Sequence, residues 1–300
     1  TGTAAQVTAA LVTTASLVVA ATAKGTISDA ASTSIAATVL SAIGAKTSGI
    51  VTVTNAIVIT GTAAQVTAAL VTADTLVVAA TTLGTISDAA DVSIAATVLS
   101  AIGGKTSGAV TVTNAIVVTG TTAAITAAMI GASSVVAATA KLTGSGTDMT
   151  DDQLAALDNT TNNIITATLA TGGVADFANM TDDSGNNVIT VNINGSGSFA
   201  ATLLSAIGGK TSGVVTATTV ITITGTTAQL TAALVTADTL VVAQAAVIGT
   251  ISDAADVSIA ATALSAIGAK TAGVVTVTNA IVITGTAAQV TAALVTTASL

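Results

Sequence analysis

Hydrophobic and polar residues follow a recurring order, which is clearest in residues 92–119, VSIAATVLSAIGGKTSGAVTVTNAIVVT. The segment opens with apolar residues at helical spacing, among them Ile94, Leu99 and Ile102, and this predicts a helix with one buried face. A pair of glycines follows, and then two short β-type runs, AVTVT and AIVVT. We call such a segment a B half. Similar B halves recur at residues 34–60, 199–224 and 257–284.

The predicted B helix is flanked by residues that commonly cap helices. Gly103 and Gly104 are predicted to end it, and Asp91 or Ser93 to cap its first turn. Aspartates also precede other B helices, where a side-chain oxygen would satisfy free backbone amides and favour the helix dipole. This N-cap role is predicted for Asp29, Asp88, Asp91, Asp253 and Asp256.

A second kind of segment lies between the B halves. Residues 61–89 read GTAAQVTAALVTADTLVVAATTLGTISDA, and we call such a segment an A half. Val66 and Leu70 lie on one face of a predicted short helix, and strands are expected over residues 76–80 and 85–87. One A half and one B half form a double repeat of 59 residues, because the triplet Thr-Gly-Thr recurs at residues 1, 60 and 119.

Residues 148–198 keep this order with a different composition. A helix is predicted over residues 151–157 and a strand over residues 164–169. A short helix holding Phe177 and a strand over residues 188–193 follow. We interpret this stretch as two atypical turns inserted into the repeat.

Repeats of this size cannot bury their apolar faces alone, and stacking neighbours in register buries them continuously. We therefore predict an α/β fold, a repetitive right-handed solenoid in which each turn of 25–30 residues has a short helix and two short parallel strands. Residues 1–300 would form a single continuous segment of about ten turns. The helices should be short, tilted or splayed, because a helix is about 10 Å wide and strands lie ~4.8 Å apart.

The composition excludes several classes of function. The chain has no His, Cys or Glu to activate a hydroxyl nucleophile, so we expect no enzyme. It carries a net charge of −8 and only two aromatic residues, both Phe, which argues against a nucleic-acid partner. Despite the high hydropathy, no 20-residue window is solidly apolar, so no membrane span is expected.

Lysines recur just after the B helices, at Lys46, Lys105, Lys210 and Lys270. The equivalent position of the A halves holds Asp74 and Asp238. This alternation predicts a ladder of charges along one edge of the stack, where like charges in neighbouring turns would repel each other. The alternative is a set of solvated loop charges that contribute about 0–1 kcal/mol per pair.

The lysine is missing from the inserted turns, where the loops carry Asp158 and then Asp182 and Asp183. Several carboxylates near amide and hydroxyl oxygens suit a hard cation, so these three residues are candidate calcium ligands. No complete calcium-loop motif is present, and a solvated acidic bulge is the alternative. No other cofactor is expected.

The segments GTAAQVTAALVTA and SIAATVLSAIGGKTSGAVTVTNAIV resemble the repeats of giant, acidic, Thr/Ala/Val-rich bacterial cell-surface proteins of the surface-layer, adhesin or filament class, such as those of cyanobacteria. The resemblance implies an extracellular, structural role without catalysis, as a rod, filament or surface coat. It also implies surface glycans or other cell-surface components as candidate partners.

Residues 1–17 are identical to residues 284–300. We therefore expect that the same chain continues or that copies associate end to end. The alternative function is a binding or adhesin module, stabilised by calcium or using outward threonine rows to bind ice or another surface. These rows would be Thr52 with Thr54, Thr111 with Thr113, and Thr276 with Thr278.

Overall fold

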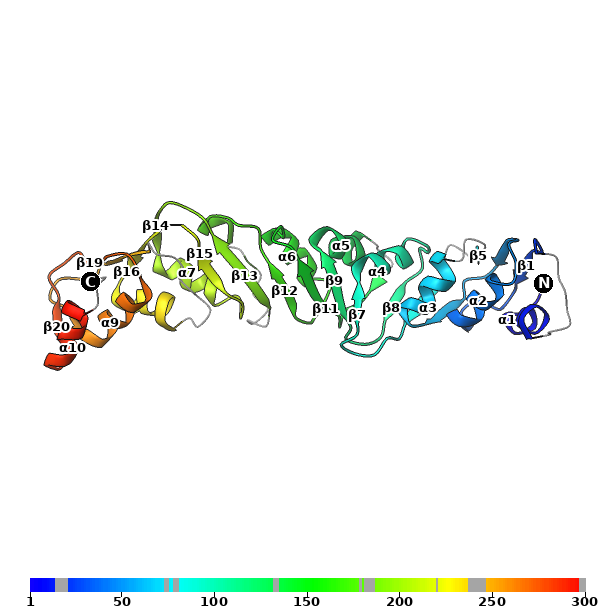
Figure 1. Cartoon of the computed structure of the whole chain (residues 1–300), viewed down its shortest axis with the longest axis horizontal. Coiled ribbons are helices and arrows are strands. Elements are labelled where there is room, and N and C mark those ends of the chain that lie inside the picture. Colours follow the sequence, from blue (N-terminus) through cyan, green and yellow to red (C-terminus); the bar gives the residue numbers. More distant parts are fainter. Residues whose placement is uncertain are drawn as a thin grey trace. The chain divides into compact units, whose positions relative to one another are not determined.

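The structure is a computed structural model, and it describes residues 1–13, 21–72, 76–77, 81–131, 135–177, 180, 187–219, 221–236 and 247–296. The chain divides into two compact units, each described here by itself. Unit 1 comprises Thr1–Ser145 and Ala156–Ile164, and unit 2 comprises Gly146–Ala155 and Ile165–Leu300. Both are mixed α/β structures (Figure 1), as predicted.

Unit 1 repeats the same order of short elements (Figure 1). Its A halves contain α1 (Ala4–Thr8), η1 (Ala9–Thr13), β1 (Gly25–Ile27), α3 (Ala63–Thr67), η2 (Ala68–Thr72), β5 (Leu76–Val77), β6 (Leu83–Ile86), α5 (Thr122–Thr126), η3 (Ala127–Gly131), β10 (Val135–Val136) and β11 (Lys141–Ser145). Its B halves contain β2 (Ser34–Ala36), α2 (Ala37–Gly44), β3 (Val51–Val53), β4 (Val58–Gly61), β7 (Ser93–Ala95), α4 (Ala96–Gly103), β8 (Val110–Val112) and β9 (Val117–Thr121).

Unit 2 begins with the inserted segments and then returns to the same order. The inserted segments contain α6 (Asp151–Asp158), of which unit 2 holds the first residues, β12 (Ile165–Thr168), the 3₁₀-helix η4 (Val174–Phe177) and β13 (Val188–Ile193). The elements that follow are β14 (Gly197–Ala200), α7 (Ala201–Gly208), β15 (Val215–Ala217), β16 (Ile221–Gly225), α8 (Thr227–Thr231), η5 (Ala232–Thr236), β17 (Ile248–Ile251), β18 (Ser258–Ala260), α9 (Ala261–Lys270), β19 (Val275–Val277), β20 (Val282–Thr284), α10 (Ala287–Thr291) and η6 (Ala292–Thr296).

The strands within each unit pair in parallel, as predicted. Unit 1 contains the sheet β10-β8-β6-β4-β2 and the sheet β1-β3-β5, and β9 lies between β7 and β11. Unit 2 contains β14-β16-β17-β19 and β18-β20, and β13 lies between β12 and β15. Some strands pair within one half, as Ile94 does with Val118, and others pair between neighbouring halves, as Thr85 does with Thr111. The register therefore repeats with the sequence.

Alternation along the strands places valine and isoleucine in the core. Val51 and Val53 of β3 are buried, whereas Thr52 between them is partly exposed. The B helices fill the remaining space, because α4 packs against both η2 and η3. Leu70 and Met129, which lie 59 residues apart in the sequence, are both buried in these two segments. Apolar residues of successive halves thus share one core within unit 1.

The helices are short, as their close spacing requires. Each A half begins with five α-helical residues and continues with five residues in the wider π-helical form, as in α3 and η2. The B helix α4 has eight residues. Among the described residues, we find no helix with the length and hydropathy needed to cross a bilayer.

The predicted start of the B helix is wrong. Ser93–Ala95 form the strand β7, which pairs with β9, and the helix begins only at Ala96. Its N-cap is Ala95, which makes no side-chain cap hydrogen bond, so neither Asp91 nor Ser93 caps this helix. The buried Ile94 suits a strand as well as a helix face.

The helix ends at Gly103, as predicted, but not through a left-handed glycine. Gly104 follows with φ −69°, a right-handed conformation open to any residue. Ala45 holds the equivalent position after α2 with φ −70°. The position therefore does not require glycine.

Candidate functional site

The polar side chains with the best-defined geometry join one half of a repeat to the next. The first set is a row of buried threonines that follow the B helices or the inserted helix α6. They are Thr47, Thr106, Thr161, Thr211 and Thr271. We call this row the threonine clamps.

Thr211 shows the clamp geometry most completely. Its hydroxyl lies 2.9 Å from the carbonyl oxygen of Ile189 and 3.2 Å from that of Asn187, both in the preceding segment. The same oxygen accepts hydrogen bonds of 2.8 Å from the backbone N–H groups of Ile189 and Gly213. One buried hydroxyl thus satisfies backbone groups on both sides of the junction.

The other clamps vary this geometry. The hydroxyls of Thr47, Thr106 and Thr161 donate to the carbonyl oxygens of Ala21, Thr82 and Ala138, respectively, in the preceding half. Thr271 instead donates to Gly268 of its own helix, at 3.3 Å.

Glycine follows most clamps because two segments of the chain approach each other closely there. A Cβ atom placed on Gly108 would overlap the carbonyl oxygen of Thr82. The same overlap with the preceding segment would occur at Gly49, Gly213 and Gly273. The sequence Thr-Ser-Gly or Thr-Ala-Gly therefore combines a threonine that bonds the preceding segment with a glycine that has no side chain to obstruct it.

A second set of bonds joins aspartates near the ends of the A halves to the N-termini of the helices with which the same halves begin. The Asp88 carboxylate accepts a hydrogen bond of 2.6 Å from the N–H of Ala63, the first residue of α3. Thr62 and Gln65 form a capping box, in which the side chain of each accepts a hydrogen bond from the backbone N–H of the other. The sequence Thr-Ala-Ala-Gln is the signal that could have predicted this capping box. The start of the A helix is thus held both by its own capping box and by an aspartate near the end of the same half.

Asp29 and Asp253 repeat this contact. Asp29 accepts from the N–H of Ala4 at 2.6 Å, and Asp253 accepts from both the N–H and the hydroxyl of Thr227 at 2.7 Å. The prediction that these aspartates cap B helices is wrong, because they cap the A helices that precede them. Asparagine side chains of the following half donate hydrogen bonds of 2.7 Å to the backbone carbonyl oxygens of these aspartates. The pairs are Asn55 with Asp29, Asn114 with Asp88, and Asn279 with Asp253.

Asp91 and Asp256 do not cap the B helices either. Both adopt a left-handed backbone conformation with φ 64°, three residues after the capping aspartates. Asp91 forms an ion pair of 2.6 Å with Lys141.

The charge ladder stays a prediction, because Asp74 and Asp238 lie outside the described residues. Lys46, Lys105 and Lys270 are exposed. Lys210 donates a hydrogen bond of 2.9 Å to the carbonyl oxygen of Met180.

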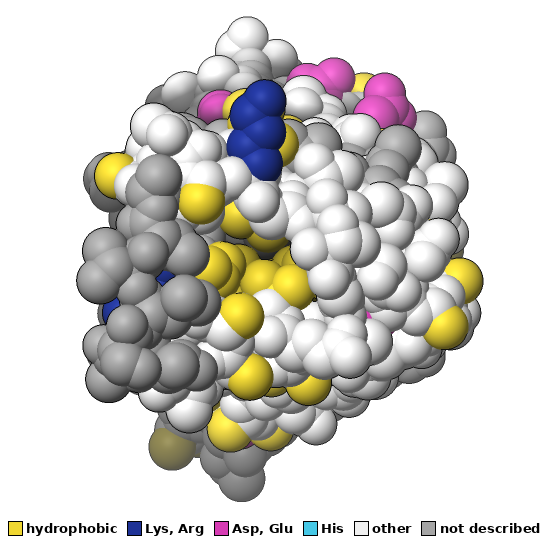
Figure 2. Space-filling view, turned by 90° about the vertical axis from the view of Figure 1, so that its right-hand side faces the viewer, with side chains coloured by type: hydrophobic (Ala, Val, Ile, Leu, Met, Phe, Trp, Pro, Cys, Tyr) yellow, Lys and Arg dark blue, Asp and Glu magenta, His cyan; other side chains and the backbone are white. Residues whose placement is uncertain are grey.

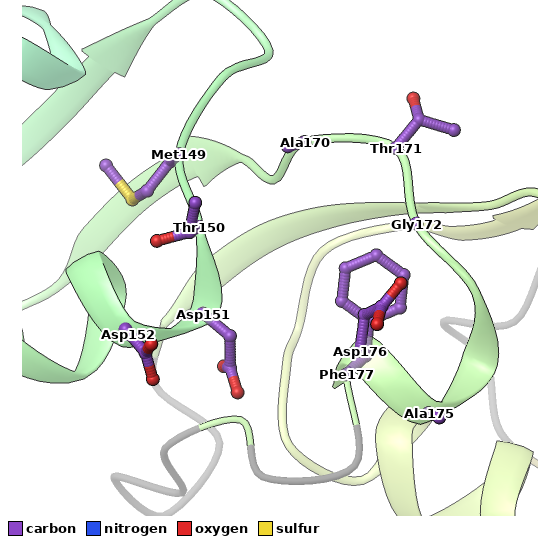
Figure 3. A pocket seen from close by; sticks show the side chains of 10 residues that line it. All are labelled: Met149, Thr150, Asp151, Asp152, Ala170, Thr171, Gly172, Ala175, Asp176 and Phe177. Carbon is purple, nitrogen blue, oxygen red and sulfur yellow. The ribbon is translucent and has the colours of Figure 1, made fainter.

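An acidic hollow of about 420 Å³ lies in unit 2 (Figure 3). Asp151 and Asp152 reach its wall from the start of α6, and Asp176 from η4. Asp176 accepts a hydrogen bond of 2.7 Å from the N–H of Gly173. Among the described residues that line it, none is a histidine, cysteine or lysine.

The surroundings of Asp151 are unfavourable for the ionised form of its carboxyl group. Burial and the neighbouring Asp152 raise its pKa, and Lys210 lowers it in part. Its buried Oδ1 atom has no hydrogen-bond partner among the described residues. The folded protein therefore opposes ionisation of this carboxyl group.

The candidate calcium site cannot be assembled from the described part of the chain. Asp158 is the last residue of α6, whereas Asp182 and Asp183 lie outside the described residues. Within the described ranges, no group of three or more acidic, histidine or cysteine residues is placed to hold a metal ion. The calcium site stays a prediction.

The threonine rows serve partly to join neighbouring halves. The hydroxyl of Thr54 donates to Ile27 O at 3.2 Å, that of Thr113 to Ile86 O at 3.1 Å, and that of Thr278 to Ile251 O at 3.0 Å. Thr111 and Thr276 are exposed and lie in register with Thr85 and Thr250 of the A halves. The rows therefore extend over A halves as well.

Comparisons with protein families, with curated proteins and with solved structures found no match to this chain.

Proposed function

We propose that this protein is a structural element of a cell surface, a right-handed α/β solenoid that contributes to an extracellular rod, filament or coat. Parallel strands joined through a helix connect with right-handed crossovers in nearly all known cases, which supports the handedness. The two units would then be parts of one continuous segment of about ten turns.

The observation that carries the proposal is the use of the buried polar groups. Thr47, Thr106, Thr161 and Thr211 all bond the preceding segment, and Asp29, Asp88 and Asp253 all bond the helix at the start of their own A half. A regular series of such bonds suits a protein whose task is to keep its repeats together.

Immunogold electron microscopy of intact source cells tests this function. Antibodies raised against the 300-residue chain should label the outer surface, at intervals that reflect a regular assembly. Matched sections of permeabilised cells serve as the control. Label that appears only after permeabilisation would contradict the extracellular role.

A binding surface is the second candidate function, and the registered threonine rows favour it. Thr60, Thr85 and Thr111 follow one another across three neighbouring strands of unit 1, which gives hydroxyl groups at strand spacing. Replacing Thr85 and Thr111 by valine should abolish surface or ice binding under this alternative and leave the structural role intact.

A further inference from the structure

One dipeptide of unit 2 combines a reactive side chain with a backbone nitrogen that can attack it. Asn194 is the only asparagine of the chain that is followed by glycine. In such a pair, the backbone nitrogen of the glycine can reach the side-chain amide carbon of the asparagine, because glycine has no Cβ to hinder the approach. Asn194 is exposed and comes directly after β13. The pair therefore makes Asn194 a candidate site of deamidation.

Deamidation of this pair needs only water and releases ammonia. First, the nitrogen of Gly195 loses its proton and bonds to Cγ of Asn194, while the bond between Cγ and Nδ2 breaks and ammonia leaves. Water then adds to one of the two carbonyl carbons of the succinimide ring that has formed. Opening at Cγ gives aspartate. Opening at the backbone carbonyl carbon gives isoaspartate, in which the main chain runs through Cβ.

The site lies in a hollow at the surface of unit 2. The hollow measures about 450 Å³, and the described residues that line it are Asn194, Gly195, Ser196 and Thr219. It is large enough to admit water, which the second step consumes.

The attacking nitrogen is restrained by a side chain of the next segment. The N–H of Gly195 donates a hydrogen bond of 2.8 Å to Oγ1 of Thr219, and the hydroxyl of Thr219 donates one of 2.7 Å to the carbonyl oxygen of Gly195. The N–H of Asn194 donates to Gly172 O at 2.8 Å. Attack on Cγ requires the nitrogen of Gly195 to lose its proton and to turn toward the side chain, so its bond to Thr219 must break first.

The strand register shows what this pair replaces. β13 pairs with β15 in the register in which β1 pairs with β3, so Gly195 and Thr219 take the places of Asp29 and Asn55. Asn55 donates to the carbonyl oxygen of Asp29, and Thr219 does the same to that of Gly195. The inserted turn therefore keeps this contact, but it has the glycine of the reactive pair where a regular half has its capping aspartate.

We propose that Asn194 is a deamidation site whose rate is controlled by Thr219. The two bonds of Thr219 slow the attack while the loop is closed, and the reaction proceeds when the loop opens. Isoaspartate lengthens the main chain by one carbon directly after β13, which shifts Gly195 away from Thr219. The modification therefore records how long this loop has been open. The inference does not rest on the proposed structural function.

The product can be separated from the unmodified chain because charges are sparse. The chain has 6 lysines and 14 aspartates among 300 residues, and Figure 2 shows how widely such side chains are scattered on one side of the protein. Deamidation adds one carboxylate and changes the net charge from −8 to −9. Ion-exchange chromatography of the intact chain should resolve this difference.

The rate of deamidation in the folded full-length chain tests the role of Thr219. At mildly alkaline pH, Thr219→Ala should react about fivefold faster than the unsubstituted chain, which corresponds to about 1 kcal/mol, the contribution of one hydrogen bond. Thr218→Ala is the matched control, because the hydroxyl of this equally exposed neighbour donates to Ile193 O at 3.0 Å rather than to Gly195. It should change the rate by less than about twofold. Circular dichroism checks that both variants fold.

Mass spectrometry of peptic peptides locates the modified residue. Asn194→Gln should abolish the reaction, because glutamine would have to form a larger ring. A synthetic peptide of residues 188–199 gives the rate without any restraint, and the folded chain should react at least about fivefold more slowly. This comparison needs no substitution, so it decides the question even if a variant fails to fold. Equal rates for Thr219→Ala and Thr218→Ala, or for the folded chain and the peptide, would overturn the inference.

Discussion

The carboxylate of Asp88 accepts a hydrogen bond of 2.6 Å from the backbone N–H of Ala63, which begins a helix 25 residues earlier in the chain. Because this bond ties the end of an A half to the helix with which that half begins, Asp88→Ala should loosen the whole A half as well as the helix. We expect a loss of about 1 kcal/mol in the free energy of unfolding, measured by urea denaturation.

Asp88→Asn is the control for this change, since an amide oxygen at the same place can still accept the bond. It should lose less stability than Asp88→Ala. If alanine and asparagine variants are both as stable as the unsubstituted chain, the contact contributes nothing to the stability of the A half.

Thr211→Val should destabilise unit 2 by about 1–3 kcal/mol, because it leaves buried backbone groups without a partner. The groups that lose a bond include the N–H of Gly213 and both backbone groups of Ile189. Thr216→Val in the adjacent strand β15 is the matched control and should change stability by less than about 0.5 kcal/mol. Similar losses in the two variants would show that the clamp hydroxyl has no special role.

Two glycines of one B half should respond to alanine in opposite ways. Gly108→Ala places a methyl group against Thr82 O, so the two halves must move apart and stability should fall. Gly104→Ala meets no atom closer than 3.4 Å, and its φ of −69° suits alanine, so stability should stay level or rise. Thermal denaturation of both variants checks the contrast, and a loss at Gly104 as large as at Gly108 would refute it.

Asp151→Asn should stabilise the protein at neutral pH. The folded state raises the pKa of this carboxyl group above its value in the unfolded chain, so stability falls as pH rises through the unfolded and then the folded pKa. Above both pKa values, the full free-energy cost of ionising this carboxyl group in the folded state is present, and asparagine removes that cost. The melting temperature of the variant should therefore exceed that of the natural chain at pH 7 and match it at pH 3.

Asp152→Asn is the companion variant in this experiment, because Asp152 contributes to the raised pKa of Asp151. It should give a smaller gain with the same pH dependence. A gain of equal size at pH 3 and pH 7 would assign the effect to something other than ionisation.

Strong local patterns predicted several elements well. The strand expected over residues 188–193 is β13, and the helix expected over residues 151–157 is α6, which ends one residue later. The start of the B helix failed because Ile94 satisfies both a strand and a helix pattern, and its pairing with Val118 decides between them. That pairing joins the two ends of one B half, which are too far apart in the sequence for local periodicity to describe.

The junction residues were harder to predict, because their partners are distant in the sequence. Asp88 precedes a B helix along the chain, yet it binds the A helix before it. The threonine clamps had a visible signal, a Thr-Ser-Gly or Thr-Ala-Gly triplet at one place in the B halves. The burial of the hydroxyl and its carbonyl partner became evident only when the neighbouring segment was in place.

The bonds of the capping aspartates and of all the threonine clamps except Thr271 join residues 21 to 26 positions apart. This separation does not grow as repeats are added, so the entropy lost in closing each loop stays constant. A chain leaving the ribosome can therefore complete each half soon after synthesis, at a rate that does not depend on how many repeats it has. Each capping aspartate is synthesised after the helix it caps, so the newest A helix is capped only when one further strand has been made. A growing chain of any length therefore exposes only its latest half to misfolding.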